Sequence, residues 1–215
     1  FVGKLDEWDL QKSHVKTDIP LVNLPFWNND GCQAWKSFLD DAEPMKENRE
    51  SKGSDIATYI YTSGTTGKCK GVVHTFESMA FPVIEAKKMM KINPNDRFLS
   101  YLPLSHVAER LLVELGGLYS GGQIYFAESL DTFAENLKYS SPTIFLGVPR
   151  IWSKFQMGIL AKMPQHKLDI FFKIPLLSGL IKSKIRKKLG LNETRMAITG
   201  AAPISKDLLI WWDKL

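Results

Sequence analysis

From Ile56 onward, short apolar segments typical of strands alternate with longer segments typical of helices. We expect strands at residues 56–62, 97–102, 123–126, 143–148 and 195–199, and helices at residues 76–90, 106–119, 130–139, 149–163 and 205–215. Strands that alternate with helices form βαβ units, in which helices cover a parallel sheet. The sequence therefore predicts an α/β fold with mainly parallel sheets covered by helices. Ligands of such folds bind beyond the carboxyl ends of the strands.

The first 55 residues lack this alternation and form a less regular part of the chain. We expect a short strand at residues 21–24 and a helix at residues 33–42. The chain is therefore divided into an irregular N-terminal part, residues 1–55, and an α/β core, residues 56–215. Because the chain begins with Phe1 rather than Met, we expect it to be a piece of a longer protein.

The composition is that of a globular protein, with 44% apolar and 24% charged residues, and no apolar run has the length of a transmembrane helix. The net charge of +5 favours anionic partners. No basic stripe interleaved with aromatic residues marks a nucleic-acid fold, so we expect phosphate-bearing ligands or a membrane surface and no nucleic acid. The two cysteines, Cys32 and Cys69, have no metal-binding spacing and indicate a reducing, cytoplasmic setting.

A loop rich in glycine and hydroxyl side chains follows the first predicted strand. Residues 62–71 contain three glycines, four hydroxyl side chains and two lysines. Glycine lets backbone N–H groups approach phosphate oxygens closely, and successive N–H groups form an anion-binding nest. Hydroxyl groups and a lysine add further donors. The loop therefore predicts a polyphosphate site, with an ordinary polar turn as the alternative.

Two common nucleotide-binding patterns do not fit this loop. The P-loop of NTPases requires a glycine at the position of Thr62 and a hydroxyl side chain at the position of Cys69. The dinucleotide-binding fingerprint also requires a glycine two residues before Gly64, where Thr62 stands. Both patterns are therefore excluded.

The loop resembles the phosphate-binding signature of acyl-adenylating enzymes, which include acyl-CoA synthetases, luciferases and peptide-synthetase adenylation domains. That signature reads Thr-Ser-Gly-Thr-Thr-Gly-x-Pro-Lys-Gly. The matching residues are Thr62, Ser63, Gly64, Thr65, Thr66, Gly67, Lys70 and Gly71. The resemblance implies that residues 62–67 and Lys70 bind the phosphates of ATP, that Thr66 and Lys70 act in catalysis, and that Thr66 contacts Mg²⁺. Cys69 stands where a proline is usual, which removes no phosphate donor.

A second motif, Leu-Pro-Leu-Ser-His-Val-Ala-Glu-Arg at residues 102–110, stands between a predicted strand and a predicted helix. We expect Ser105 to cap the helix and His106 to lie in its first turn, where the helix dipole favours an anion. From the residues alone, a structural histidine is the commoner case. The motif resembles Leu-Pro-Leu-Ser/Ala-His-x-x-Glu-Arg of long-chain fatty acyl-CoA synthetases, which implies that His106 lies near the reacting acyl carboxylate. Glu109 and Arg110 are expected to form an ion pair.

Two further stretches follow predicted strands. Val-Pro-Arg-Ile-Trp at residues 148–152 resembles a stretch of the long-chain synthetases, although Arg150 and Trp152 also fit a helix start with a core aromatic residue. The second stretch resembles the one that borders adenine in the adenylating family, although a tight turn before a helix capped by Ser205 is an alternative. It consists of Gly200, Ala201, Ala202 and Pro203, with Ala201 in place of a frequent glycine.

The segment from Ile170 to Leu189 combines apolar and basic side chains. Pro175 and Gly179 are expected to divide it into two short helices. A basic amphipathic helix can lie on a membrane surface, which makes peripheral membrane contact one expectation. The commoner alternative is a surface helix that packs its apolar face on the sheet and solvates its basic face.

The resemblance covers residues 56–203 and implies part of the layered αβαβα N-terminal domain of acyl-adenylating enzymes. It implies a long-chain fatty acid–CoA ligase that forms AMP. The carboxylate of the fatty acid would attack the α-phosphate of ATP, with Mg²⁺, to give acyl-adenylate and pyrophosphate. The thiol of coenzyme A would then displace AMP.

The family motifs that should follow Pro203 are not in this chain. They are an aromatic-Gly-x-Thr-Glu motif, an acidic ribose-binding motif and a C-terminal domain with a catalytic lysine. We therefore expect these 215 residues alone not to be a competent ligase. Two alternatives remain, a non-catalytic nucleotide- or phosphate-binding domain and an adenylating enzyme for another carboxylic acid, such as an amino or aryl acid. The motif at residues 102–110 argues against the second.

Overall fold

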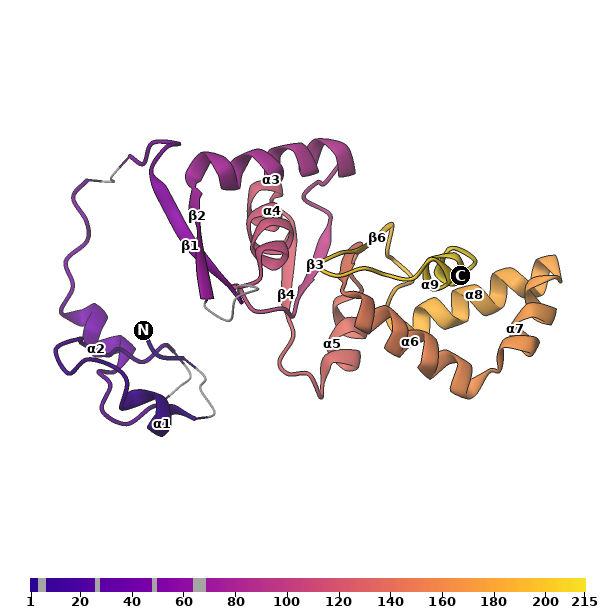
Figure 1. Ribbon diagram of the computed structural model, residues 1–215, viewed down its shortest axis with the longest axis horizontal. Helices are drawn as coiled ribbons and strands as arrows, with labels where there is room; N and C mark the ends of the chain where they lie inside the picture. Colours follow the sequence, from indigo (N-terminus) through magenta and orange to yellow (C-terminus); the bar gives the residue numbers. More distant parts are fainter. Residues whose placement is uncertain (4–6, 26–27, 48–49, 64–68) are drawn as a thin grey trace. The chain divides into compact units, whose positions relative to one another are not determined.

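The computed structural model describes residues 1–3, 7–25, 28–47, 50–63 and 69–215. Figure 1 shows the order of the helices and strands along the chain. The chain divides into two compact units, Phe1–Glu50 and Ser51–Leu215. The sequence placed this boundary between residues 55 and 56.

The first unit has little regular structure. Two isolated parallel bridges join Val2 to Asn23 and Val22 to Gln33, in the region where a short strand was expected. The side-chain amide of Asn29 donates to the carbonyl of Gly3 at 3.1 Å, which adds a polar tie to these bridges. The two helices of the unit are α1 (Trp8–Lys12) and α2 (Trp35–Asp40), and α2 lies within the helix expected at residues 33–42.

The second unit contains the predicted strands and helices. Its strands are β1 (Ile56–Ser63), β2 (Cys69–Thr75), β3 (Arg97–Ser100), β4 (Gln123–Phe126), β5 (Ile144–Gly147) and β6 (Met196–Thr199). Its helices are α3 (Phe76–Met90), the π-helix η1 (Glu109–Leu115), α4 (Gly116–Ser120), α5 (Phe133–Ser140), α6 (Pro149–Lys162), α7 (Gln165–Phe172), α8 (Pro175–Leu189) and α9 (Lys206–Asp213). The α/β class is confirmed, and β2 is the strand that the sequence did not predict.

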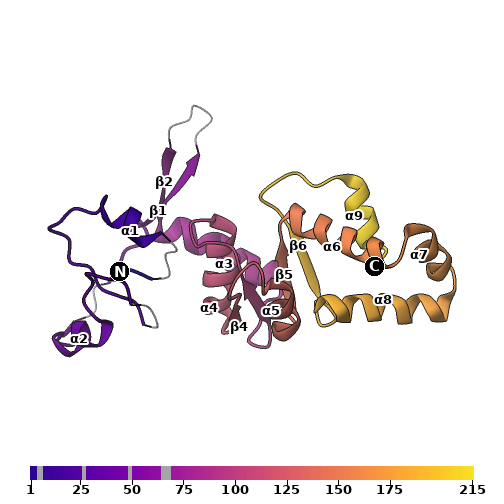
Figure 2. The ribbon, with the colours of Figure 1, turned by 90° about the horizontal axis from the view of Figure 1, so that it is seen from below.

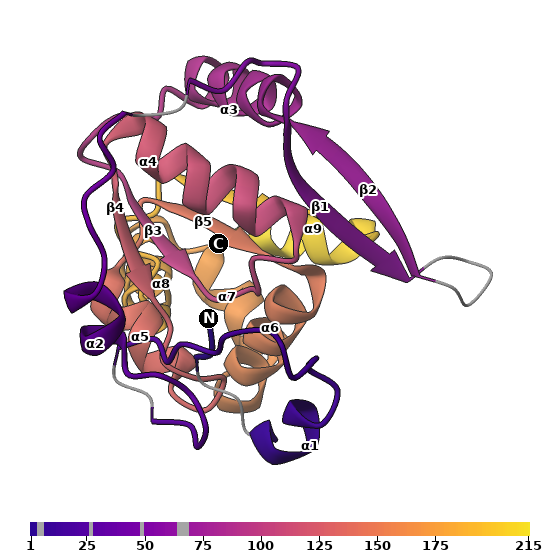
Figure 3. The same cartoon turned by 90° about the vertical axis from the view of Figure 1, so that its left-hand side faces the viewer.

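Four strands of the second unit run in the same direction. β3 pairs with β4 and β5 pairs with β6, both in parallel. β3 and β5 are joined at their starts, where the N–H of Thr143 donates to the carbonyl of Arg97 at 3.1 Å. They are joined at their ends by Tyr101, whose hydroxyl donates to the carbonyl of Leu146 at 3.0 Å. The strands therefore lie in the order β4–β3–β5–β6, as two parallel pairs without a ladder between β3 and β5, and Figure 3 shows β4, β3 and β5 side by side.

β1 and β2 form an antiparallel hairpin instead of joining the parallel strands. The β-branched and aromatic residues from Ile56 to Tyr61 predict a buried strand, and this prediction is wrong, since Ile60 is buried but Ile56, Tyr59 and Tyr61 are exposed. The reason is that β1 pairs with the segment immediately after the loop, which leaves most of both faces of a two-stranded ribbon in solvent. Residues 69–75 gave no clear strand signal because glycine and lysine are depleted in strands.

Helix α3 begins and ends where the sequence predicted, and its caps explain both limits. The Oγ1 of Thr75 accepts the N–H of Ser78 at 3.2 Å, and the Oγ of Ser78 accepts the N–H of Thr75 at 2.9 Å. This capping box satisfies two N–H groups that a helix start leaves without intrahelical partners. The helix ends at Lys91, whose φ of 50° is left-handed.

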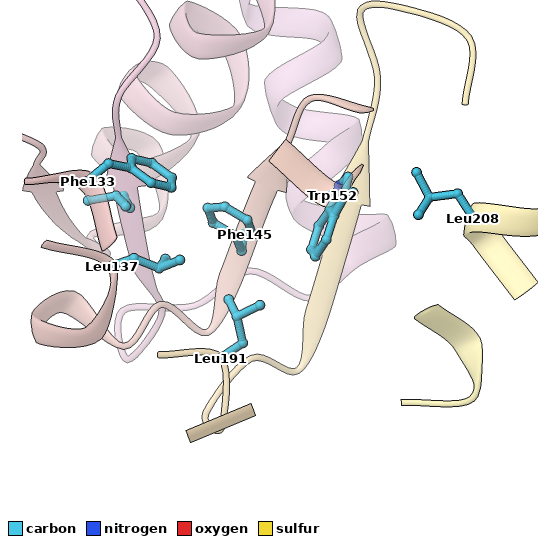
Figure 4. Close-up of a cluster of buried hydrophobic side chains, with 7 residues drawn as sticks. Phe133, Leu137, Phe145, Trp152, Leu191 and Leu208 are labelled. Carbon is cyan, nitrogen blue, oxygen red and sulfur yellow. The ribbon is translucent and has the colours of Figure 1, made fainter. Parts of the chain in front are cut away.

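The main apolar core packs the parallel strands against α5, α6 and α9, as Figure 4 shows. Its buried residues are Leu99, Phe133, Leu137, Phe145, Trp152, Leu191 and Leu208. The indole N–H of Trp152 donates to the carbonyl of Gly147 at 2.8 Å, and a Cβ on Gly147 would lie 2.6 Å from the indole ring. Glycine at the end of β5 therefore lets the first turn of α6 pack on the strand, and Trp152 is a core residue.

The segment from Ile170 to Leu189 holds the end of α7 and the whole of α8, so one break at residues 173–174 takes the place of the two expected short helices, and Figure 2 shows α7 and α8 at the end of the unit that also carries α9. Pro175 occupies the first turn of α8, whereas Gly179 lies inside that helix and does not interrupt it. The buried face of the pair includes Leu168 and Ile185. Among the described residues, no helix combines the length and apolar character needed to cross a membrane.

Candidate functional site

The phosphate-loop residues Gly64, Thr65, Thr66, Gly67 and Lys68 lie outside the described residues, but the strands on either side are described. Thr62 lies opposite Lys70 and Ser63 lies opposite Cys69 in the hairpin. The backbone pairing therefore brings the two ends of the loop together, and the exposed Lys70 stands on the strand that leaves it. A polyphosphate bound by the loop would therefore have Lys70 close to one end of the loop.

Gly71 has a packing role in this hairpin. It lies opposite Tyr61, and a Cβ at Gly71 would lie 3.2 Å from Cε1 of the tyrosine ring. The ring therefore covers the glycine, an arrangement that lets an aromatic side chain compensate for a glycine in a strand. Lys70 and Gly71, the last two residues of the motif, thus have different roles. Lys70 is an exposed cation, and Gly71 makes room for the ring of Tyr61.

The other predicted site residues follow the carboxyl ends of three parallel strands. The connector to His106 follows β3, Arg150 follows β5, and Gly200 follows β6. Tyr101 joins the first two of these ends, because its hydroxyl also accepts the N–H of Val148 at 3.2 Å. Burial raises the pKa of Tyr101, so the phenol stays neutral and keeps the proton that it donates to the carbonyl of Leu146.

His106 caps the helix that follows it, in place of Ser105. Its carbonyl accepts the N–H groups of Glu109 and Arg110 at 3.0 and 3.2 Å. Its Nδ1 accepts the N–H of Ala108 at 3.3 Å, so the neutral ring carries its hydrogen on Nε2. The expected place of His106 inside the first turn is therefore wrong by one position, because the imidazole competes successfully for the cap. The side chain is partly exposed, and Nε2 is its remaining hydrogen-bonding group.

Glu109 and Arg110 do not form the expected ion pair. Arg110 contacts Glu114, with 3.5 Å between Nη1 and Oε2, and its Nε donates to the carbonyl of Leu104 at 3.1 Å. Glu109 is 0% exposed, and among the described residues neither of its carboxyl oxygens has a hydrogen-bond partner. The two residues point apart because consecutive residues of a helix do not face each other. The helix here is a π-helix, a form that is often found at functional sites.

The pKa of Glu109 is raised, and burial is the main cause. The Ser100 hydroxyl and the N–H groups of Leu102 and Tyr101 act in the opposite direction, and the charge of Glu114 adds to the rise. Sequence reasoning missed this buried acid. No local pattern marks it, because Glu109 and Glu114, five residues apart, lie one turn apart only when the helix is a π-helix.

The stretch at residues 200–203 starts beside a buried hydroxyl. The Oγ1 of Thr199, the last residue of β6, is buried and has no hydrogen-bond partner among the described residues. Ala201 has a φ of 69°, in the left-handed region that favours glycine. A Cβ at Gly200 would have open space around it, and Ala202 and Pro203 are exposed. The helix after them is capped by Ser205, as predicted, since its Oγ accepts the N–H of Leu208 at 3.3 Å.

Within the described part of the chain, no group of three or more His, Cys, Asp or Glu residues gathers as a metal site. Thr66, the residue assigned to Mg²⁺ from the sequence, lies outside this part. Its assignment stays a prediction.

Solved structures share this fold. The adenylation domain of a carboxylate reductase from Mycobacterium chelonae superposes with a TM-score of 0.67 at 22% identity, over 85% of this chain and 29% of that one. A didomain of carboxylic acid reductase from Segniliparus rugosus, in complex with AMP, gives a TM-score of 0.59 at 27% identity, over 80% of this chain and 24% of that one.

Curated relatives include fatty-acid–CoA ligases. The long-chain-fatty-acid–CoA ligase ACSBG2 of Gallus gallus is 31% identical, over 82% of this chain and 28% of the relative. The putative fatty-acid–CoA ligase fadD11 of Mycobacterium tuberculosis is 32% identical, over 76% of this chain and 34% of the relative. The chain thus spans about a third of the length of these relatives. The family model of AMP-binding enzymes matches residues 3–215. The chain therefore belongs to the AMP-binding enzyme family.

Proposed function

We propose that the protein activates a long-chain fatty acid in two steps, with ATP, Mg²⁺ and coenzyme A as the other reactants or cofactors. The fatty carboxylate attacks the α-phosphate of ATP, the bond to pyrophosphate breaks, and acyl-adenylate forms. The thiol of coenzyme A then attacks the acyl carbon and AMP leaves. The chain contributes part of the nucleotide and acyl sites of this enzyme.

In this proposal each part of the site has one task. Lys70 and the loop residues from Thr62 to Gly67 bind the phosphates and stabilise the charge that develops on them. The Nε2–H of His106 is the donor available to the acyl carboxylate, because Nδ1 is already used by the backbone. The residues Gly200, Ala201, Ala202 and Pro203 border the adenine, and the hydroxyl of Thr199 is a free partner beside them. Mg²⁺ would neutralise phosphate charge, with Thr66 as its candidate contact.

One observation carries the proposal. The His106 motif and the Gly200 stretch, 94 residues apart in number, follow β3 and β6, two strands of one parallel set. Parallel strands bring their carboxyl ends to the same edge, which is where nucleotides bind in such folds. A protein with only a structural role would not need polar and small residues at this edge of the strands.

ATP–pyrophosphate exchange in the full-length protein tests the proposal. Exchange should depend on palmitate and fall for short acids. Lys70→Ala and Thr66→Ala should each lower kcat/KM for ATP by on the order of 10²-fold, because each removes a group that stabilises phosphate charge. The matched control is Lys154→Ala, which removes an exposed lysine of α6 and should leave exchange unchanged.

The alternatives give different results in the same assay. A non-catalytic nucleotide-binding protein would bind ATP without any acid-dependent exchange. An adenylating enzyme for amino or aryl acids would exchange with those acids and not with palmitate. Wild-type exchange in both the Lys70 and Thr66 variants would contradict the phosphate assignment.

We further propose that α7 and α8 contact an anionic membrane surface. Leu176 and Leu180 are 88% and 69% exposed, and they stand one turn apart on α8. Lys184 and Lys188 continue the same stripe of the helix and are also exposed. An exposed stripe with an apolar first half and a basic second half matches a helix that inserts apolar side chains while its lysines meet lipid headgroups.

A further inference from the structure

The connector between β3 and the helix after it, residues 101–105, is approached from two sides by consecutive residues. Arg110 reaches its exposed side and donates to the carbonyl of Leu104 at 3.1 Å. Glu109 lies on the buried side, next to the N–H groups of Tyr101 and Leu102 and the hydroxyl of Ser100. The connector leads directly to His106, whose N–H donates to the carbonyl of Pro103 at 2.8 Å.

The carboxyl of Glu109 has no cation to pair with in the described part of the chain. The neighbouring guanidinium of Arg110 faces Glu114 instead, and the other ionisable groups that act on Glu109 are the acids Glu114 and Tyr101. A fully buried carboxylate without a cation or a complete set of hydrogen bonds is far less stable than the neutral acid. The neutral acid suits its neighbours, since its carbonyl oxygen can accept a backbone N–H while its hydroxyl donates to Ser100.

We propose that Glu109 is a positioning residue of this site. It is a neutral buried acid that contacts the buried side of residues 101–105, while Arg110 contacts their exposed side. Together the two residues fix the position of His106. The polar groups of Ser100, Tyr101 and Leu102 lie beside this carboxyl in the described part of the chain. This inference rests on the proposed function, because it assigns His106 to the acyl carboxylate.

The test compares three variants of the full-length protein. Glu109→Gln keeps the shape, one acceptor and one donor of a neutral acid but cannot ionise, whereas Glu109→Leu removes every polar contact. Glu85→Gln is the matched control, because Glu85 is an exposed glutamate of α3 that pairs with Lys88. Steady-state kinetics give kcat and the KM values for palmitate and ATP, and infrared difference spectra between wild type and Glu109→Gln detect the C=O stretch of a protonated carboxyl.

We expect Glu109→Gln to stay within about twofold of wild type in all kinetic constants. Glu109→Leu should lower kcat by on the order of 10²-fold, as expected for a misplaced reacting group, with little change in KM for ATP. The protonated carboxyl band should be present at neutral pH. The inference is overturned if that band is absent, if the Gln variant is as impaired as the Leu variant, or if the Leu variant behaves like wild type.

A third measurement does not depend on catalysis. Amide hydrogen exchange should be faster at Tyr101 and Leu102 in Glu109→Leu than in wild type, and unchanged there in Glu109→Gln. If wild type shows no palmitate-dependent exchange of pyrophosphate, the proposed function fails, but the infrared band and the amide protection still decide whether Glu109 holds the connector. If the Leu variant does not fold, the band and the Gln kinetics decide.

Discussion

Ala201 shows how one residue can carry backbone strain at the carboxyl edge of the parallel strands. Its φ of 69° lies in the left-handed region, where a Cβ crowds the backbone and costs about 1–2 kcal/mol. The sequence indicated that glycine is frequent at this position in related enzymes, and the structure supplies the physical reason. The chain therefore keeps a conformation that glycine would adopt freely.

We predict that Ala201→Gly stabilises the protein slightly. Relief of the left-handed strain should outweigh the larger entropy that glycine gives the unfolded chain, with a net gain of about 0.5–1 kcal/mol in the free energy of unfolding. Ala202→Gly is the matched control. Since Ala202 has no positive φ, the change should destabilise by about 0.5–1 kcal/mol. Urea denaturation measures both, and equal losses in the two variants would show that Ala201 is not strained.

Among the elements, Asp96 joins the end of α3 to the starts of three strands. Its carboxylate accepts Nη2 of Arg195 at 2.6 Å and the hydroxyl of Thr143 at 2.7 Å. The same guanidinium donates to the carbonyl of Met90, the last residue of α3, at 2.9 Å. Burial alone would raise the pKa of Asp96, but the hydrogen bonds from Arg195, Thr143 and the N–H of Asn93, with the charge of Arg195, lower it.

This pKa shift predicts a loss of stability in acid. Because the pKa of folded Asp96 is lowered, its contribution is fully present above the unfolded pKa of about 3.9 and is lost as pH falls through the folded pKa. Asp96→Asn should cost about 3 kcal/mol at neutral pH, since it leaves Arg195 and Thr143 with a weaker acceptor. The difference from wild type should shrink between about pH 5 and about pH 2.

Urea denaturation followed by tryptophan fluorescence, repeated over this pH range, measures the effect. The control is Glu85→Gln, which removes an exposed pair with Lys88 and should have a much smaller effect with little pH dependence. A constant difference between Asp96→Asn and wild type over the whole range would contradict the assignment of a lowered pKa.

Local sequence signals placed most elements of the second unit. The caps and hydrophobic period of α3 lie within residues 75–91, and β4 is a short apolar run between turns, so both could be located from the sequence. The π-helix could not be, because its hydrophobic pattern is that of an ordinary helix. Residues 69–75 were missed as a strand because their glycine and lysine residues weaken the local strand signal, and the pairing with β1 is not a local feature.

The same limit applies to the site. The motifs identified His106 and Gly200 because their residue types stand at recognisable spacings. Sequence alone could not show that the imidazole caps a helix, that Glu109 is buried, or that Asp96 and Arg195, 99 residues apart, pair with each other. Each of these depends on packing between elements that are distant in the chain, which no local pattern records.

For the whole molecule, the exposed stripe of α8 sets the prediction for membrane contact. Leu176→Ser with Leu180→Ser should weaken binding to vesicles of phosphatidylserine and phosphatidylcholine by tenfold or more, because each exposed leucine contributes on the order of 1.5 kcal/mol when buried in lipid. Lys184→Gln with Lys188→Gln should lose about 1 kcal/mol per lysine and most of the salt dependence.

Vesicle co-sedimentation measures both effects, with phosphatidylcholine vesicles as the uncharged comparison. The matched control is Leu209→Ser with Ile210→Ser, two partly exposed apolar residues of α9 that are outside the stripe. Anionic vesicles should bind wild type and this control equally. If the leucine and lysine variants also bind like wild type, α8 is an ordinary surface helix whose exposed leucines have no lipid partner. If only the lysine variant is impaired, the helix meets headgroups without insertion, and the apolar half of the stripe needs another explanation.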